Sequence, residues 1–338
     1  MAQLILIGLL AFLFGIATHR GTICSVIAAA QLCRTGYASR LVGFLVGAAC
    51  AFAVTVPIAW LNPDTVKLYA DFGIVPAIVV GGAFYGLGAL VNGACLFGTF
   101  SRLTAGDTTF LFTIPGIGLG SLVAQHLGLA GLRGPSASPL MSTPGALTAT
   151  LYVAGLVFAI ASAAAVLAAL RRAGVGPMRL MRAKHWRPAL SMVLIGATGG
   201  ALFLLSDAWA PPALIKRIAA LLAGGAPAFP LESLLGPAAL FAGGGLAALF
   251  SGRLKVRPPK ALAAVRALAG GTMMGTAAGA VPGGNDTMLL AAVPSLAVSG
   301  TLAYLAMFAV LVPAFFAYYR LGARSQEPES GSAAAGRG

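Results

Sequence analysis

The chain has 338 residues, of which 59% are hydrophobic and only 9% are charged, and its formal net charge is +14. Soluble domains contain about 25% charged residues, so this composition excludes a water-soluble protein and predicts a membrane protein. The basic residues lie in short clusters between apolar runs. That pattern is typical of membrane topology signals and argues against a continuous face for nucleic acid.

Nine apolar runs are long enough to cross, or nearly cross, a bilayer core of about 30 Å. They cover residues 4–17, 41–61, 73–91, 108–127, 145–170, 188–205, 233–251, 261–281 and 299–319. Four shorter runs cannot span the bilayer and are expected to be re-entrant or half helices buried within the protein. These are 22–33, 93–100, 215–223 and 287–298. We therefore predict an all-α polytopic integral membrane protein with about nine transmembrane helices plus short half helices.

The loops predict the orientation of the chain. Residues 171–187 and 252–260 contain basic residues and no acid, whereas 62–72 contains two acids and 128–144 contains only Arg133 as a charged residue. Basic loops stay in the cytoplasm, which also predicts a cytoplasmic C-terminus. The first run lacks a basic region before it and is expected to be a retained helix rather than a signal peptide. The side of the N-terminus stays open, because residues 4–33 could cross once or fold back.

The basic loop 171–187 divides one transporter domain, residues 1–324, into halves of about 1–175 and 185–320. Each half contains a Gly-Gly-x-x-x-Gly segment, starting at Gly81 and at Gly270, that leads to a glycine-rich break with a polar side chain. Paired interrupted helices of this kind indicate a transporter binding site between two pseudo-symmetric halves. The remaining residues, 325–338, have no apolar period and are predicted to be a disordered cytoplasmic tail.

The first break covers residues 18–25 (THRGTICS). Gly21 permits a turn, and Thr22 or Ser25 can cap the short helix that follows. The N-terminus of that helix suits an anion, and Cys24 lies beside it. The alternative is structural: His19 and Arg20 reach the membrane interface, and Cys24 is a small buried hydrophobe.

The second break covers residues 91–102 (VNGACLFGTFSR). Gly93 and Gly98 flank Cys95 and let a substrate approach the backbone. Thr99 and Arg102 follow. Glycine is also a common packing device in membrane helices, so the glycines alone decide nothing.

The third break covers residues 281–287 (VPGGNDT). The Pro-Gly-Gly sequence, with Gly283 and Gly284, ends a helix, and Asn285, Asp286 or Thr287 can cap the next one. A carboxylate at membrane depth is costly and usually lines a polar path. The alternative is that Asp286 only caps a helix or pairs with Arg20 or Arg102.

Two further cysteines, Cys33 and Cys50, lack such surroundings and are expected to be packing residues. The four cysteines have neither disulfide-framework nor zinc-site spacing.

Taken together, these motifs resemble the YeeE/YedE family of bacterial inner-membrane transporters for thiosulfate and related sulfur compounds. The family's N-terminal Arg-Gly-x-x-Cys pattern is similar to Arg20, Gly21 and Cys24. Its Gly-Gly-Cys-x-x-Gly-Thr segment resembles residues 93–99 (GACLFGT), and its C-terminal Gly-Gly-x-Leu-Met-Gly segment resembles residues 270–275 (GGTMMG). The family's basic, tryptophan-containing loop resembles residues 184–188 (KHWRP).

The resemblance implies about nine spanning helices, short helices entering from both faces, and a narrow passage lined by three cysteines that pass thiosulfate by S–H···S hydrogen bonds. Cys24 and Cys95 match the first two positions. The third position holds Asn285, whose amide can donate to an anion but cannot act as a thiol. Asp286 would repel an anion unless it is protonated or paired. Either the relay works with two thiols and an amide, or the cargo is another sulfur species.

We therefore predict a permease, not an enzyme, for a small inorganic sulfur anion, most simply thiosulfate. Cys24, Cys95 and Asn285 are the predicted pathway, and Arg20, Arg102 and helix N-termini attract the anion. No cofactor or metal is expected, and the expected partners are the lipid bilayer and a cytoplasmic sulfur-carrier protein. The alternatives are a membrane-embedded thiol enzyme or sulfur carrier that uses Cys24 or Cys95 covalently, and a structural membrane subunit.

Overall fold

The computed structural model describes residues 1–64, 66–281 and 283–324. Pro282 of the third break and the predicted disordered tail, residues 325–338, lie outside the described residues. Within the described ranges the chain folds into helices without β-strands, and extended pairing is limited to two isolated bridges, Asp71–Ala137 and Asp107–Arg257. The predicted all-α fold class is confirmed.

The longer helices follow the predicted apolar runs closely, because each run is bounded by Gly, Pro or charged residues that end a helix. They are α1 (Ala2–Gly21), α3 (Ser39–Leu61), α4 (Pro76–Asn92), α6 (Thr113–His126), α7 (Ala146–Arg172), α9 (Pro188–Leu205), α11 (Glu232–Phe250), α12 (Ala261–Ala280) and α14 (Val298–Arg324).

The shorter elements include the four predicted half helices. The shorter helices are α2 (Ser25–Thr35), α5 (Leu96–Thr104), α8 (Pro177–Arg182), α10 (Pro211–Leu222) and α13 (Asn285–Thr287), which continues as the π-helical turn η5 (Met288–Ala292). The 3₁₀ turns are η1 (Thr108–Phe112), η2 (Leu129–Arg133), η3 (Leu140–Ser142) and η4 (Asp207–Trp209). The last half helix was expected to reach residue 298 but ends at Ala292. Residues 293–296 form turns that lead into α14.

Eight helical stretches of the described chain are long and apolar enough to cross a membrane. Two of them join a long helix to a half helix, α1 with α2 and α4 with α5. The predicted ninth span is α12, which has 20 residues. It falls outside the eight because its many Gly and Thr residues, together with Arg266, make it less apolar.

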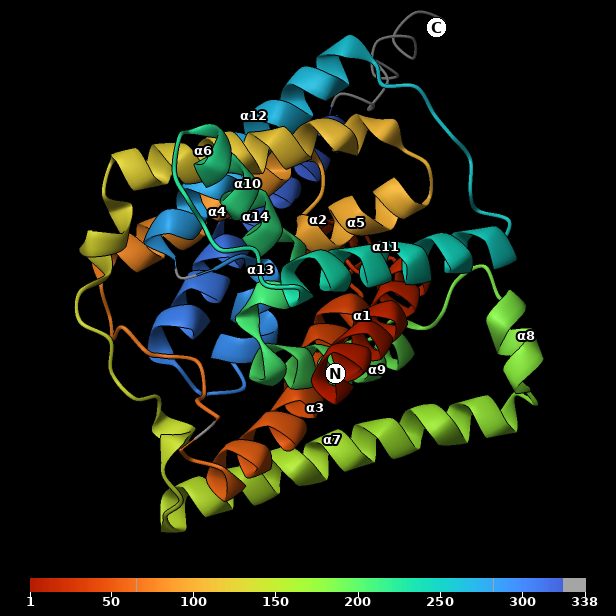
Figure 1. The fold of residues 1–338 in the computed structure, drawn as a ribbon. Helices are drawn as coiled ribbons and strands as arrows, with labels where there is room; N and C mark the ends of the chain where they lie inside the picture. Colours follow the sequence, from red (N-terminus) through yellow and green to blue (C-terminus); the bar gives the residue numbers. More distant parts are fainter. Residues whose placement is uncertain (65, 282, 325–338) are drawn as a thin grey trace, which may run out of the picture.

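One group of helices forms around α1, which lies against α9, α11 and the half helix α5 (Figure 1). A second group consists of α4, α6, α12 and α14, in which α12 packs against both α6 and α4, and α4 packs against α14. The helix α7 lies along one edge of the molecule against α3 and α9, and most of its surface is exposed (Figure 1). An apolar, exposed helix of this length is expected to face lipid.

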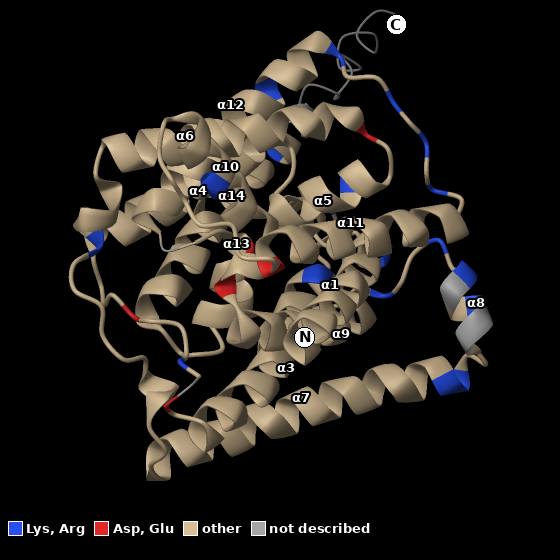
Figure 2. Ribbon diagram, in the orientation of Figure 1, with Lys and Arg blue, Asp and Glu red and all other residues tan. Residues whose placement is uncertain are grey.

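The bundle has two distinct ends. One end, called here the basic end, contains α8 and the connection from α11 to α12, where Lys and Arg gather (Figure 2). The opposite end contains the connections α3–α4 and α6–α7. Gln3, near the start of α1, donates a hydrogen bond to the carbonyl of Leu205 at the end of α9, 3.0 Å away. Near the end of α1, the carbonyl of Arg20 accepts from the backbone N–H of Trp186, which lies just before α9. The N-terminus therefore lies at the end opposite the basic end, and α1 crosses the bundle once.

The two Gly-Gly-x-x-x-Gly helices, α4 and α12, pack side by side. A Cβ atom on Gly270 would lie 2.7 Å from the carbonyl oxygen of Gly88. The same helices use their other glycines against different partners: Gly82 against α14 and Gly271 against α6. Close backbone contact on two faces is possible because these positions carry no side chain.

Candidate functional site

The three predicted breaks meet in one buried layer at the centre of the bundle. Cys24, Cys95 and Gly284 are the residues that immediately precede α2, α5 and α13. Cys24, Cys95 and Asn285 are all almost completely inaccessible to solvent. The structure thus brings together the three residues that the sequence assigned to a pathway.

Hydrogen bonds connect the three breaks directly. The backbone N–H of Ser25 donates to Sγ of Cys95 over 3.2 Å, and the backbone N–H of Cys95 donates to Sγ of Cys24 over 3.4 Å. The hydroxyl of Ser25 donates to Oδ1 of Asn285 over 3.4 Å. Each thiol therefore lies against the N–H of the partner break. Because partial positive charge concentrates at helix N-termini, this layer suits an anion.

The second break is built by Gly93 and Asn92. Gly93 ends α4 in the left-handed conformation at φ 74°, which a residue with a side chain adopts only with strain. The Asn92 amide then donates to the carbonyl of Ala94 (2.7 Å) and to the hydroxyl of Thr99 (3.1 Å), and Thr113 donates to its oxygen (2.8 Å). Thr99 thus fixes the break through Asn92. Asn92 was not singled out from the sequence, although a buried amide beside a helix-ending glycine is a usable signal.

Gly98 has a different role from Gly93. It lies in the first turn of α5, and a Cβ atom there would lie 2.6 Å from Sγ of Cys24. The absence of a side chain at Gly98 therefore leaves the space that the Cys24 thiol occupies. This is a close approach between two of the breaks that the sequence spacing alone does not reveal.

The first break differs from its expected local geometry. The helix α1 runs through Gly21, and Thr22 takes the left-handed conformation at φ 48°. Gly21 is needed for packing, because a Cβ atom there would lie 2.5 Å from Cβ of Ser191. Two contacts hold Thr22 in this conformation. Its carbonyl accepts from Arg40 over 2.8 Å, and its hydroxyl lies 3.4 Å from Nδ1 of His185.

Arg20 is buried and directed toward the basic end, where it donates to the carbonyl of Ala183. The backbone N–H of Trp186 in turn donates to the carbonyl of Arg20 over 3.0 Å. Arg253 reaches the carbonyl of His19 over 3.1 Å. The segment 183–187 therefore lies across the end of the first break, and Arg20 is one of its attachments.

The third break leaves two buried polar atoms without hydrogen-bond partners among the described residues. They are Nδ2 of Asn285 and Oδ1 of Asp286, in side chains that are 0% and 3% exposed. Gly283, at φ 120°, gives the chain the reversal that separates α12 from α13. Buried polar groups are nearly always paired, so the Asn285 amide keeps a hydrogen-bond donor in this layer that no described residue uses.

Two cavities lie on either side of the buried layer. The large cavity, about 810 Å³, reaches Gly283, Gly284 and Asp286 and is also lined by Gly275 and Gly279 near the end of α12. The small cavity, about 520 Å³, reaches Val26, Gly93 and Arg102 and is also lined by Arg266 near the start of α12. Residues 266 and 279 are separated by about 20 Å along one helix, at 1.5 Å per residue. The cavities therefore open toward opposite ends of the bundle.

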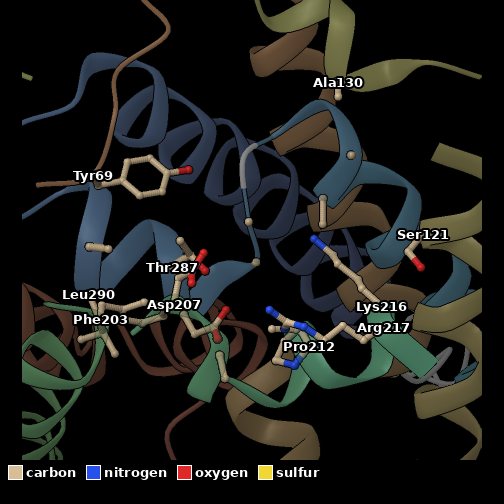
Figure 3. A pocket seen from close by; sticks show the side chains of 18 of the residues that line it. Tyr69, Ser121, Ala130, Phe203, Asp207, Pro212, Lys216, Arg217, Thr287 and Leu290 are labelled. Atoms are coloured by element: carbon tan, nitrogen blue, oxygen red, sulfur yellow. The ribbon is translucent and has the colours of Figure 1, made fainter. Parts of the chain in front are cut away.

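The large cavity contains cationic side chains that the sequence did not single out. Lys216 and Arg217 of α10 extend into it, near Asp207 (Figure 3). Arg133 also lines it and donates to the carbonyl of Gly279 over 2.9 Å. The half helix α10 was predicted, but only the tertiary fold directs its two cations toward the third break. Four cations and two acids line this cavity, so its charge favours anions.

Arg102 and the remaining cysteines are placed as follows. Arg102 lines the small cavity, with its guanidinium 4.9 Å from the centre of the Phe110 ring. Cys33 donates to the carbonyl of Val312, and Cys50 packs against Val46 and Ala159. Both are outside the central layer. Neither Arg20 nor Arg102 forms an ion pair with Asp286 among the described residues.

Discontinuous helices whose broken ends meet between two oppositely placed cavities are typical of membrane transporters. Residues 20–312 match the family described as sulphur transport, the YeeE/YedE family, and the chain belongs to that family. No match was found among curated proteins. Family and fold together identify a multi-pass membrane protein of sulfur transport.

Proposed function

We propose that this chain is a permease for thiosulfate, and that the anion passes between the two cavities through the layer of Cys24, Cys95 and Asn285. One observation carries the proposal: the three breaks meet, hydrogen-bonded to one another, where the two cavities approach from opposite ends. The layer offers a thiol at two positions and an amide donor at the third. Neutral donors bind an anion without the repulsion that thiolates would cause.

The proposed route begins in the large cavity. Its cations raise the local concentration of anions, because long-range attraction concentrates a charged substrate at a matching surface. The amide Nδ2 of Asn285, which lacks a partner among the described residues, is the first donor of the layer. Cys95 and Cys24 follow, and the anion leaves past Gly93 into the small cavity, where Arg102 and Arg266 lie.

The proposed orientation places the basic end in the cytoplasm of a bacterium, with the protein in the inner membrane. Basic residues concentrate at that end (Figure 2), and positively charged loops remain on the cytoplasmic side. The large cavity then faces outward, the N-terminus lies outside, and the C-terminus lies inside. Movement from the large cavity to the small one is uptake.

The direct test is exchange of labelled thiosulfate in proteoliposomes that hold unlabelled thiosulfate, at equal pH on both sides. We expect saturable exchange that sulfate does not support. Cys95→Ala should reduce the rate at least tenfold while the protein still inserts and folds, because the thiol is lost but little volume is removed. Cys33→Ala and Cys50→Ala are the matched controls and should exchange like the unmodified protein. Normal exchange by Cys95→Ala would remove this thiol from the mechanism.

The same vesicles separate transport from covalent thiol chemistry. A permease of this design forms no covalent bond to its cargo, so mass spectrometry during turnover should find Cys24 and Cys95 unmodified. Both thiols are buried, whereas reactive cysteines are usually partly exposed thiolates. A persulfide trapped on either residue would favour the sulfur-carrier alternative. Absence of exchange with every sulfur anion would favour a structural subunit.

A further inference from the structure

Asp286 is a buried carboxylate beside the proposed pathway that the relay of thiols and amide does not use. It is 3% exposed, it follows Asn285 directly, and its Oδ1 has no hydrogen-bond partner among the described residues. It lines the large cavity together with Gly283 and Gly284. A pure helix cap would use its oxygens on the helix N–H groups, so a buried oxygen left without a partner needs another explanation.

The charged groups around Asp286 do not neutralise it by direct contact. On the cavity wall, Lys216 and Arg217 come from α10, Arg133 from η2 and Lys67 from the connection α3–α4, and Asp207 and Tyr69 complete the titratable groups there. None of these cations forms an ion pair with Asp286 among the residues that the structure describes. The attraction of Lys216 acts at longer range.

On the side of Asp286 that faces the thiols, the neighbouring titratable group is Tyr85 of α4. A Cβ atom on Gly284 would lie 2.7 Å from Oδ1 of Asp286 and 3.6 Å from the hydroxyl of Tyr85. Tyr85 is 2% exposed and also lies close enough to Cys95 for an electrostatic interaction. Asp286 thus lies between the large cavity, which it lines, and the buried layer, which it approaches next to Tyr85.

An ionised Asp286 conflicts with anion transport. Removing a carboxylate from water favours its protonated form, and a nearby anion favours that form further. A protonated carboxyl group has no charge to repel the anion and can donate a hydrogen bond to it. The anion and a proton on Asp286 therefore stabilise each other at this point of the pathway.

We propose that Asp286 couples thiosulfate uptake to an inward proton flow, so that the protein is a proton–thiosulfate symporter. This proposal rests on the proposed function. Water in the large cavity supplies one proton to the Asp286 carboxylate, and the anion then binds at Asn285 beside the neutral carboxyl group. When the anion moves to the small cavity, the proton leaves Asp286 to the cytoplasmic water by the same opened path. The carboxylate re-forms, so the proton count balances, and each cycle carries the dianion and one proton inward, a net transfer of one negative charge that potassium and valinomycin compensate in the test below.

The experiment uses proteoliposomes with potassium and valinomycin holding the membrane potential at zero and with the outside one pH unit more acidic. One proton per anion predicts accumulation of labelled thiosulfate by about tenfold inside, since one pH unit corresponds to a factor of ten in proton activity. A pH-sensitive dye inside should report acidification when thiosulfate is added. Exchange at equal pH, measured in the same vesicles, tests the permease itself and so separates failure of coupling from failure of transport.

Asp286→Asn mimics the protonated carboxyl group and cannot release a proton. We expect it to retain exchange within about threefold but to lose both accumulation and internal acidification, whereas Asp286→Glu retains both. Asp207→Asn is the matched control, because Asp207 lines the same cavity but is exposed, and it should remain coupled. Accumulation by Asp286→Asn at the unmodified level would overturn the proposal. So would the absence of thiosulfate-dependent acidification in the unmodified protein that still exchanges, or a folded Asp286→Asn that has lost exchange.

Discussion

The contact between Gly98 and Cys24 allows one prediction to be worked out in detail. Gly98→Ala places a methyl group 2.6 Å from Sγ and 3.0 Å from Cβ of Cys24. Ordinary van der Waals contact begins at 3.4 Å, so the thiol must move by the difference, ~0.8 Å, or change rotamer. The space on the other side is filled, because Cys24 is 1% exposed. The substitution therefore displaces the thiol from the backbone N–H of Cys95.

Two magnitudes follow from this displacement. Overpacking a tightly filled site costs roughly 1–3 kcal/mol of stability. A shift of about 1 Å in a group that must meet its substrate reduces rates by up to about a hundredfold, so we expect exchange of thiosulfate to fall at least tenfold. The assays are exchange in proteoliposomes and thermal unfolding of the purified protein in detergent.

The matched control is Gly245→Ala. Gly245 lies in α11, and a Cβ atom there has no neighbour within 4 Å, so stability and exchange should stay unchanged or improve slightly with helix propensity. Adding Cys24→Ala to Gly98→Ala should restore most of the stability but not exchange, because it removes the thiol and its 2.6 Å contact and leaves only the 3.0 Å contact with Cβ. Exchange by Gly98→Ala within twofold of the unmodified protein would refute the placement of the Cys24 thiol on the pathway.

Three further predictions concern the third break, the opposite end and the orientation. Asn285→Cys should keep or raise thiosulfate exchange, because it supplies the thiol of the family's third position. Asn285→Leu should block exchange, because leucine offers the anion no hydrogen-bond partner. Normal exchange by the leucine variant would place this residue off the path. Asp71→Ala should lower the stability by about 1–2 kcal/mol, since its carboxylate accepts from the N–H groups of Val298 and Ser299 at the start of α14; an unchanged melting temperature would contradict this. A reporter at 175–183 should be cytoplasmic and one at Gly134 external, and a cytoplasmic Gly134 would reverse the proposed orientation.

The stability contribution of Asp71 should also depend on pH. Burial alone would raise the pKa of Asp71, but hydrogen bonds from the Ser299 hydroxyl and from backbone N–H groups outweigh it and lower the pKa below its usual value. Because the pKa is lower in the folded protein, the contribution is full above the unfolded value of about 4 and is lost as the pH falls through the folded value. The difference in melting temperature between Asp71→Ala and the unmodified protein should therefore shrink in acid. A constant difference down to pH 3 would argue against a charged cap.

The sequence by itself determined the helical fold and the position of nearly every helix. Each apolar run carries its own boundaries in Gly, Pro and charged residues, so α3, α9 and α11 begin and end within two residues of their predicted limits. Lengths of about ten residues marked α2, α5 and α10 as half helices, because such segments cannot cross a bilayer. These are local properties of the chain. The three breaks were found for the same reason.

Only the tertiary structure shows that the three breaks form one site. That Cys24, Cys95 and Asn285 share one layer depends on contacts between residues up to 260 positions apart, as in the bond from Ser25 to Asn285. Local pattern also failed at Gly21, where packing against Ser191 rather than a turn explains the glycine. The cations of α10 and the unpaired Oδ1 of Asp286 became visible only with the cavity that they line. Side-chain direction and burial depend on neighbours distant in sequence, and a single chain without its fold does not specify them.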